Sequence, residues 1–337
     1  MLQLFRNNQP IVALLLLGLL ALLRLGALYN PPEAVLYNSG LASDMIYALV
    51  GGATGWLPNL LSALLVFVQA LLVNRLVTNF QIAPENTYFP ALFYIILTSF
   101  SPTLQWLSPA LIAITVLFII LNQLYDSYKP VGAADIAFNI GFWIAVGSLV
   151  YSSFWVFLVL GIIGLQIMRA FHPEEVIILF IGFFVPYFLI GVGYFWFTGF
   201  DGLWVLFIKR EILAHIGFLY FKISWTWEVV FTLVVWLAAL LAAFYSSSQF
   251  FNRLSNLMER CMRLLFWTLG IAFVSVVFQN KMGIDHLFMF AIPLGVFTAL
   301  NFMLIQNRQY AEFGFLTLLL VTVAYQYQAP VLMLLAK

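Results

Sequence analysis

Charged residues are scarce in this sequence. Asp, Glu, Lys and Arg make up 8% of its 337 residues, against about 25% in a typical soluble globular protein. Fourteen Lys and Arg stand against thirteen Asp and Glu, which leaves a net charge of +1. The sequence therefore lacks both the polar surface of a soluble protein and the basic field that nucleic acid requires.

Cysteine, histidine and the standard catalytic motifs are also missing or rare. The single cysteine, Cys261, excludes an intramolecular disulfide framework and any CxxC pair. HExxH, GxSxG, DxD, GxGxxG and Walker patterns do not occur, and three histidines make no convincing metal site. These absences argue against a metalloprotease, a serine hydrolase and an ATP-driven machine. We expect neither a metal nor a cofactor.

Large apolar side chains are abundant instead. Hydrophobic residues make up 64% of the chain, with 35 Phe, 15 Tyr and 10 Trp, which is too many for a disordered chain. A bilayer core of roughly 30 Å requires about 20 apolar residues per helix. Apolar runs of about this length are separated by polar residues and cover approximately Pro10–Tyr29, Trp56–Leu76, Thr87–Phe100, Thr103–Leu124, Asp135–Val150, Ser153–Ala170, Glu175–Phe197, Glu228–Tyr245, Arg263–Phe278, His286–Ile305 and Glu312–Tyr327. They predict an all-α, polytopic transmembrane helix bundle of about eleven spans, one integral membrane domain over residues 1–337.

The distribution of basic residues predicts the orientation of these spans. With Arg6 in the cytoplasm and the spans alternating, seven further basic residues fall on the same side: Arg75, Lys129, Arg169, Arg253, Arg260, Arg263 and Arg308. The opposite side receives five, three of them in one loop: Lys209, Arg210, Lys222, Lys281 and Lys337. Arg24 lies inside the first span and counts for neither side. We therefore expect a cytoplasmic N-terminus and an outer C-terminus.

Two connecting segments are amphipathic. Residues 251–265 place apolar and charged side chains on opposite helical faces, which predicts a cytoplasmic helix in the headgroup plane. The outer loop at about 198–227 places Glu211, His215 and Lys222 on one helical face, after Lys209 and Arg210. Two interpretations stay open for this loop: an aromatic interfacial belt with a local Glu211–His215 pair, or a helix that points its cations toward the protein.

The first outer loop, at about 30–55, contains two carboxylates, of which Glu33 follows Pro32 and is expected to be solvated, while Asp44 lies on a predicted helix. Prolines end the first span, a short helix is predicted through Val50, and Gly51, Gly52 and Gly55 break the chain before the second span. Asp44 lies at the start of that short helix. It either favours the positive end of the helix dipole or acts as a general base toward an acceptor hydroxyl.

A second outer polar cluster opens the tenth span. Lys281, Asp285 and His286 follow one another there, and Asp285 is placed to pair with Lys281 and to cap the helix. Alternatively, Lys281 and His286 join the cations of the 198–227 loop in a pocket for phosphate, which Arg and Lys bind well.

Several stretches resemble known membrane proteins. LFRNNQP (Leu4–Pro10), APENTYFPALFYIILTSFSP (Ala83–Pro102) and the segment Ala137–Ile177 resemble an uncharacterised family of polytopic inner-membrane proteins of Bacteroidota. More loosely, the SFSP ending of the third span and IGFWIAVGSLVYSSFWVFL (Ile140–Leu158) are similar to helices of the GT-C class of glycosyltransferases.

The GT-C resemblance implies a function and a location. It implies a glycosyltransferase at the outer face of a bacterial inner membrane, with a polyprenyl-phosphate-linked sugar as donor and a role in envelope glycan assembly. Asp44 then takes the general-base position, and Lys209, Arg210 and Lys222 contact the donor phosphate. Members of this class often carry two adjacent acids in the first outer loop, whereas this sequence has Asp44 with Glu33 eleven residues away.

Two other functions stay open from the sequence. A non-enzymatic subunit or scaffold of an envelope assembly, with other inner-membrane proteins as partners, fits the lack of a complete catalytic constellation. A flippase or secondary transporter of lipid or solute requires ionisable groups that converge inside the membrane. Arg24 is the deepest charge of the sequence, and no acidic partner for it is evident.

Overall fold

A computed structural model describes residues 1–7, 9–29, 32, 39–128, 133–169, 172–202, 204, 208, 226–250, 255–279 and 283–335. Within these ranges the regular structure is helical, and the one β-contact is an isolated bridge between Ser39 and Tyr151. The predicted all-α class is therefore confirmed.

Eleven α-helices correspond to the eleven predicted spans. They are α1 (Pro10–Tyr29), α3 (Trp56–Asn79), α4 (Phe89–Thr98), α5 (Pro109–Asp126), α6 (Ala133–Val150), α7 (Leu158–Met168), α8 (Pro173–Gly202), α9 (Trp227–Phe250), α10 (Asn256–Val276), α11 (Phe288–Leu304) and α12 (Arg308–Leu335). The short predicted helix after the first span is α2 (Leu41–Val50). Four 3-10 segments complete the order: η1 (Leu2–Arg6), η2 (Pro102–Leu104), η3 (Ser152–Phe157) and η7 (Ile284–Leu287).

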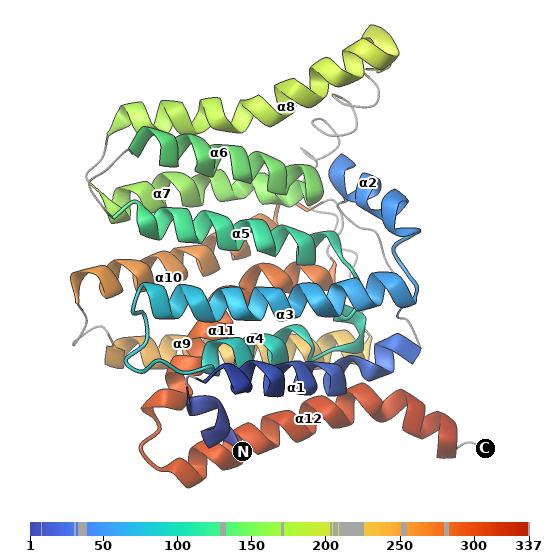
Figure 1. The fold of residues 1–337 in the computed structure, drawn as a ribbon, viewed down its shortest axis with the longest axis vertical. Helices are drawn as coiled ribbons and strands as arrows, with labels where there is room; N and C mark the ends of the chain where they lie inside the picture. The colour runs from blue at the N-terminus through green and yellow to red at the C-terminus, as the bar shows by residue number, and fades with distance from the viewer. Residues whose placement is uncertain are drawn as a thin grey trace.

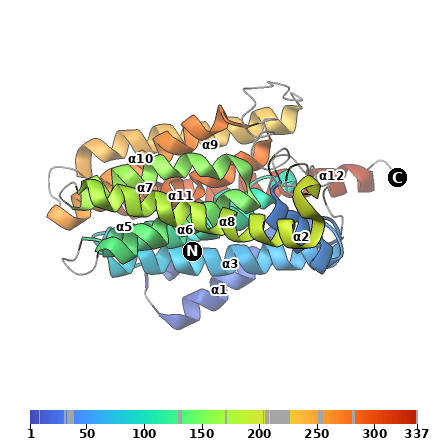
Figure 2. The same cartoon turned by 90° about the horizontal axis from the view of Figure 1, so that it is seen from above.

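The long helices lie side by side and alternate in direction (Figures 1 and 2). Among the described residues, six helices are long and apolar enough to cross a membrane: α1, α3, α5, α8, α9 and the segment from η7 through α11. The chain is therefore a multi-pass membrane protein. The count of eleven crossings stays a prediction, because the apolar helices α4, α6 and α7 are shorter.

The alternation gives the bundle two distinct ends. The α2 end, on the right in Figure 1, carries α2, the C-terminal end of α8 and the N-terminal ends of α3, α5 and α9. The opposite end, which we call the arginine end, carries basic residues on η1, α3, α10 and α12 and after α7: Arg6, Arg75, Arg169, Arg260, Arg263 and Arg308. At this end Arg6 forms a two-point pair with Glu85, with nitrogen–oxygen distances of 2.7 and 2.8 Å.

Close helix packing depends on small residues. A Cβ on Gly182 of α8 would overlap the Phe138 carbonyl oxygen of α6, and a Cβ on Gly141 of α6 would overlap the Leu179 carbonyl oxygen of α8. Small residues allow membrane helices to approach at the backbone, where dispersion contacts replace the hydrophobic driving force that lipid removes. Several aromatic side chains of α8, such as Phe184, Phe188 and Trp196, are exposed, which suits contact with membrane lipid.

Arg24, the deepest charge of the sequence, is buried and 2% exposed. Its guanidinium donates to Ser62 Oγ at 2.6 Å, to Ser99 Oγ at 3.1 Å and to two backbone carbonyls at 3.4 Å. Those carbonyls belong to Thr98, the last residue of α4, and to Gln105, which follows η2 in the connection between α4 and α5. Irregular backbone inside a membrane protein is tolerated where protein groups satisfy it, and Arg24 supplies several of these bonds.

The predicted cytoplasmic helix at 251–265 has a different form in the structure. Residues 251–254 lie outside the described residues, and from Asn256 the chain continues to Val276 as the single helix α10. Cys261 and Leu265, on the apolar face of this predicted interfacial helix, are buried in the protein core. The apolar face of this segment therefore packs against protein, because α10 lies between neighbouring helices from its second turn onward.

Candidate functional site

The α2 end holds a group of polar residues from four separate parts of the chain. The Gly40 amide donates to the Val150 carbonyl at 3.0 Å, and the Tyr47 hydroxyl donates to the Leu107 carbonyl at 2.8 Å. A Cβ on Gly40 would overlap the Leu149 carbonyl oxygen. These contacts fix α2 across the ends of α6 and the α4–α5 connection.

Asp44 lies in the first turn of α2 and is half-buried. The N-cap residue is Gly40, and no side chain accepts a capping hydrogen bond there. Ser43 donates its hydroxyl to the Gly40 carbonyl at 2.7 Å. Asp44 is thus placed where the helix dipole favours a carboxylate, yet it does not act as the N-cap.

Asp285 of η7 approaches the same region from the other half of the chain. The Trp106 indole lies within hydrogen-bonding reach of its carboxyl group. Its Oδ1 atom is buried and has no hydrogen-bond partner among the described residues. A buried carboxylate oxygen without a donor is costly, so within the described part of the chain this position holds an unused acceptor.

Tyr47 lies near both carboxylates. Burial raises the pKa of its phenol above the usual range, and the charges of Asp285 and Asp44 raise that pKa further. Tyr47 therefore stays protonated, in agreement with its hydrogen bond to the Leu107 carbonyl. Asp44 and Asp285, which are 241 positions apart in the sequence (285 minus 44), converge on this one side chain.

His286, next in sequence to Asp285, belongs to a different network. Its Nε2 lies 3.0 Å from the Ala272 carbonyl, which can only accept, so Nε2 carries the proton. Its Nδ1 then accepts from the Tyr151 hydroxyl at 2.9 Å, and Tyr151 accepts from Gln279 Nε2 at 2.8 Å. Because both ring nitrogens are bonded within the protein, His286 would have to leave this network to reach a phosphate.

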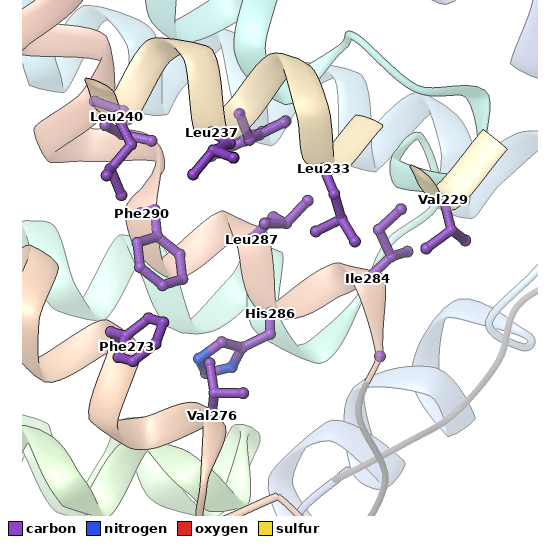
Figure 3. Close-up of a pocket in the computed structure, with 13 residues that line it drawn as sticks. Val229, Leu233, Leu237, Leu240, Phe273, Val276, Ile284, His286, Leu287 and Phe290 are labelled. Atoms are coloured by element: carbon purple, nitrogen blue, oxygen red, sulfur yellow. The ribbon is translucent and has the colours of Figure 1, made fainter. Parts of the chain in front are cut away.

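An apolar cavity of about 310 Å³ opens between α9, α10 and the η7–α11 segment (Figure 3). His286 points into it, and its other walls are formed by apolar side chains such as Leu233, Phe273 and Leu287. Leu237 and Phe273, at its margin, are 55% and 70% exposed, so the cavity opens sideways toward lipid. Gly283, Ile284, His286 and Leu287 line the cavity, whereas Asp285 between them turns toward Trp106 and Tyr47.

The structure describes two of the seven predicted site residues. Asp44 and His286 both lie at the α2 end, Asp44 on α2 and His286 on η7. The other five lie outside the described residues: Lys209, Arg210, His215, Lys222 and Lys281. Of the predicted outer loop at 198–227, residues 198–202 continue α8, where Gly199 has a φ of +72° and bends the helix.

Sequence reasoning missed three residues of this site. Asp285 was assigned to a local pair with Lys281, because the two stand four positions apart. Tyr47 follows Asp44 by one helical turn, so a search of the α2 face would have found it. Trp106 lies in an irregular stretch that carries no periodic signal.

Comparison with known proteins gave little. No protein-family model and no curated protein matches the chain, so the resemblance to the Bacteroidota family stays a prediction. Among solved structures, the chain is similar to the archaeal oligosaccharyltransferase AglB from Archaeoglobus fulgidus, in complex with an inhibitory peptide and a dolichol-phosphate. The TM-score is 0.46 at 12% identity; the match covers 92% of this chain, which spans about half (51%) of the length of AglB. We therefore base no functional argument on this likeness.

Proposed function

We propose that this protein is a membrane glycosyltransferase that uses a lipid-linked sugar donor at its α2 end and serves envelope glycan assembly. The observation that supports the proposal is the convergence of two carboxylates beside an apolar, membrane-facing cavity. A reaction on a lipid-linked sugar requires both a polar centre for the sugar and an apolar site for the lipid chain. At this end of the bundle, the segment η7 lies between the carboxylates and the apolar cavity.

Asp44 is the proposed general base. Its carboxylate takes the proton from an acceptor hydroxyl while the acceptor oxygen attacks the anomeric carbon of the donor sugar. The bond from that carbon to the lipid phosphate oxygen breaks, and the phosphate leaves with the electron pair. Asp285 Oδ1 is the proposed acceptor for a sugar hydroxyl, because its lone pairs are otherwise unused among the described residues.

The lipid part of the donor is assigned to the cavity between α9, α10 and α11. An apolar cavity that opens sideways inside a bilayer takes up hydrocarbon chains, because water gains no partners there. For the donor phosphate we propose the cations Lys209, Arg210, Lys222 and Lys281. His286 and His215 are assigned to the same substrate group, with His286 at the wall of the cavity.

The proposed location is a bacterial inner membrane. Arginine residues accumulate at the end opposite Asp44 and Asp285, and basic residues mark the cytoplasmic side of membrane proteins. The N-terminus is then cytoplasmic, while the α2 end and the C-terminus face the periplasm. Membrane lipid is the common partner, and contacts with other inner-membrane proteins belong to the scaffold alternative.

The test is the exchange Asp44→Asn in the full chain, reconstituted in lipid nanodiscs and supplied with polyprenyl-phosphate-linked sugars. Loss of a general base lowers transfer by about 10²–10⁴-fold, and we expect unchanged protein yield and thermal stability. Asp201→Asn is the matched control, since Asp201 is an exposed carboxylate near the same end. Surface glycans and lipid-linked intermediates of cells that carry each variant give the second readout.

Either of two results would sink the proposal. One is a set of unchanged glycans and lipid-linked intermediates with normal amounts of the Asp44→Asn protein. The other is that the chain co-purifies with envelope proteins, that their complex fails to assemble without the chain, and that the complex assembles normally with the Asp44→Asn variant. This result favours the non-enzymatic subunit. Transfer by the purified chain alone removes that alternative.

A further inference from the structure

A second polar pocket lies at the arginine end, between α7 and α10, and has a volume of about 500 Å³. Its α7 wall consists of Ile163, Gln166 and Ile167, and its α10 wall consists of Arg260, Arg263 and Trp267. Each set follows helical spacing, so each presents one face of its helix to the pocket. None of these residues takes part in the proposed transfer.

The fold holds Arg260 against the pocket wall. Its Nη1 donates to the carbonyls of Ile167 and Met168, at 3.1 and 2.7 Å, and thereby caps the C-terminal end of α7. The guanidinium carbon also lies 5.4 Å from the centroid of the Tyr128 ring. Within the described residues its Nε and Nη2 donate no further hydrogen bond, so Arg260 is positioned with donors to spare.

Arg263 is the exposed member of the pair. Its side chain is 59% exposed, and its Nη2 lies 2.5 Å from Glu259 Oε1, one turn earlier on α10. The pocket region therefore carries two guanidinium groups against one carboxylate. A pocket of about 580 Å³ between α3 and α5 differs in this respect, because there Arg75 faces Asp126 and no positive charge is left over.

Trp267 sets the depth of the pocket in the membrane. It is 49% exposed and follows Arg263 by about one helical turn, toward the middle of α10. Tryptophan prefers the boundary between headgroups and hydrocarbon, so the two arginines lie at headgroup level. Ile163 and Ile167 give the facing wall an apolar surface against which a glycerol backbone and the first chain carbons can pack.

We propose that the α7–α10 pocket binds the phosphodiester headgroup of an anionic phospholipid. Guanidinium groups bind phosphate through paired N–H donors, and basic pockets between membrane helices on the cytoplasmic side bind such headgroups. The lipid phosphate competes with Glu259 for Arg263 and adds contacts to the free donors of Arg260. The proposal is independent of the transfer reaction at the α2 end.

The experiment titrates cardiolipin or phosphatidylglycerol into the delipidated full chain in neutral detergent, with phosphatidylcholine as reference. Native mass spectrometry measures bound lipid, and the shift in unfolding temperature gives an apparent Kd. Arg263→Gln should weaken anionic lipid binding about fivefold, since one basic group near a lipid surface contributes about 1 kcal/mol. Glu259→Gln should strengthen binding, because it removes the competing carboxylate, while Arg75→Gln at the same end should have no effect.

Arg263→Gln and Glu259→Gln are expected to change lipid affinity in opposite directions. A folding defect would instead weaken lipid binding in both variants. Inorganic phosphate serves as the separate arm for a soluble ligand and should give no shift. The proposal is overturned if phosphatidylcholine binds equally well, if Arg263→Gln leaves the Kd unchanged, or if inorganic phosphate alone produces the full shift.

Discussion

Asp44 and Asp285 both lie near Tyr47 but are held in different ways. Asp44 is half-buried in the first turn of α2, where the helix dipole favours its charge. Asp285 lies in a 3-10 segment, close to the Trp106 indole, with Oδ1 buried and without a partner among the described residues. Asp285 is therefore the carboxylate whose position costs stability, which is a property of functional rather than structural residues.

This difference predicts the effect of Asp285→Asn. The exchange keeps the shape and removes a charge, so we expect an unfolding temperature equal to or above that of the original protein. Sugar transfer should fall about tenfold or more, because a hydrogen bond to a charged group contributes about 1.5–3 kcal/mol. The measurement pairs thermal unfolding with the nanodisc transfer assay, with Asp135→Asn, an exposed carboxylate in the first turn of α6, as control. A lower unfolding temperature with full activity per folded molecule would assign Asp285 to the fold alone.

At this scale the sequence identified Asp44 and missed its partner. A lone acid between two helix breakers stands out in a sequence with thirteen acids, and its place on a short helix follows from local rules. Asp285 instead has a plausible local partner four residues away, so local rules explain it fully. Its approach to Tyr47 depends on how η7 packs against α2 and the α4–α5 connection, and no local pattern contains that information.

Hydropathy predicted the helices well, but it missed helix boundaries in segments whose backbone groups are satisfied by side-chain hydrogen bonds. The run Ser153–Ala170 was expected as one helix, but it begins as the 3-10 segment η3 and becomes α-helical at Leu158. The third predicted span was expected to reach Phe100, but α4 ends at Thr98 and irregular backbone follows from Ser99. There Gln105 Nε2 donates to the carbonyls of Leu23 and Ser99, at 3.2 and 3.3 Å. An apolar run indicates that a segment is favourable in lipid. It does not indicate which backbone groups will be hydrogen-bonded by side chains instead of by a helix.

The close contact between α6 and α8 predicts that a larger side chain at Gly182 of α8 lowers the unfolding temperature. Gly182→Leu should separate the two helices, because any Cβ at this position overlaps the Phe138 carbonyl oxygen. Overpacking of this kind costs about 1–3 kcal/mol, occasionally more, so we expect a clear fall in unfolding temperature. Gly193→Leu on the same helix is the control, since no heavy atom lies within 4 Å of the position that a Cβ would take there. Equal unfolding temperatures for the two variants would show that α8 does not depend on this close approach.

The molecule as a whole places most of its described arginines at one end. Asp44, Asp285, His286 and the buried Arg24 lie toward the α2 end, and the other described arginines lie at the arginine end, where carboxylates such as Glu85 and Glu259 pair with them. This separation follows from the alternation of helices, which hydropathy and the basic residues predicted together. Arg24 also bears on the transporter alternative: its guanidinium donates to hydroxyl and carbonyl oxygens, so it forms no acid–base relay with the described residues.

The separation predicts a defined labelling pattern in intact cells. Met45→Cys places a thiol on an exposed position of α2, and Asn86→Cys places one at the opposite end, in the exposed connection before α4. A membrane-impermeant maleimide should label Met45→Cys in cells with a permeabilised outer membrane. It should label Asn86→Cys only after the inner membrane is opened, because the arginine end then faces the cytoplasm. The native Cys261 is buried and should stay unlabelled in both, which makes the unmodified protein the background control. The reverse pattern would place the carboxylates in the cytoplasm and would exclude transfer at the periplasmic face, whereas the Asp44→Asn result would still decide whether transfer occurs at all.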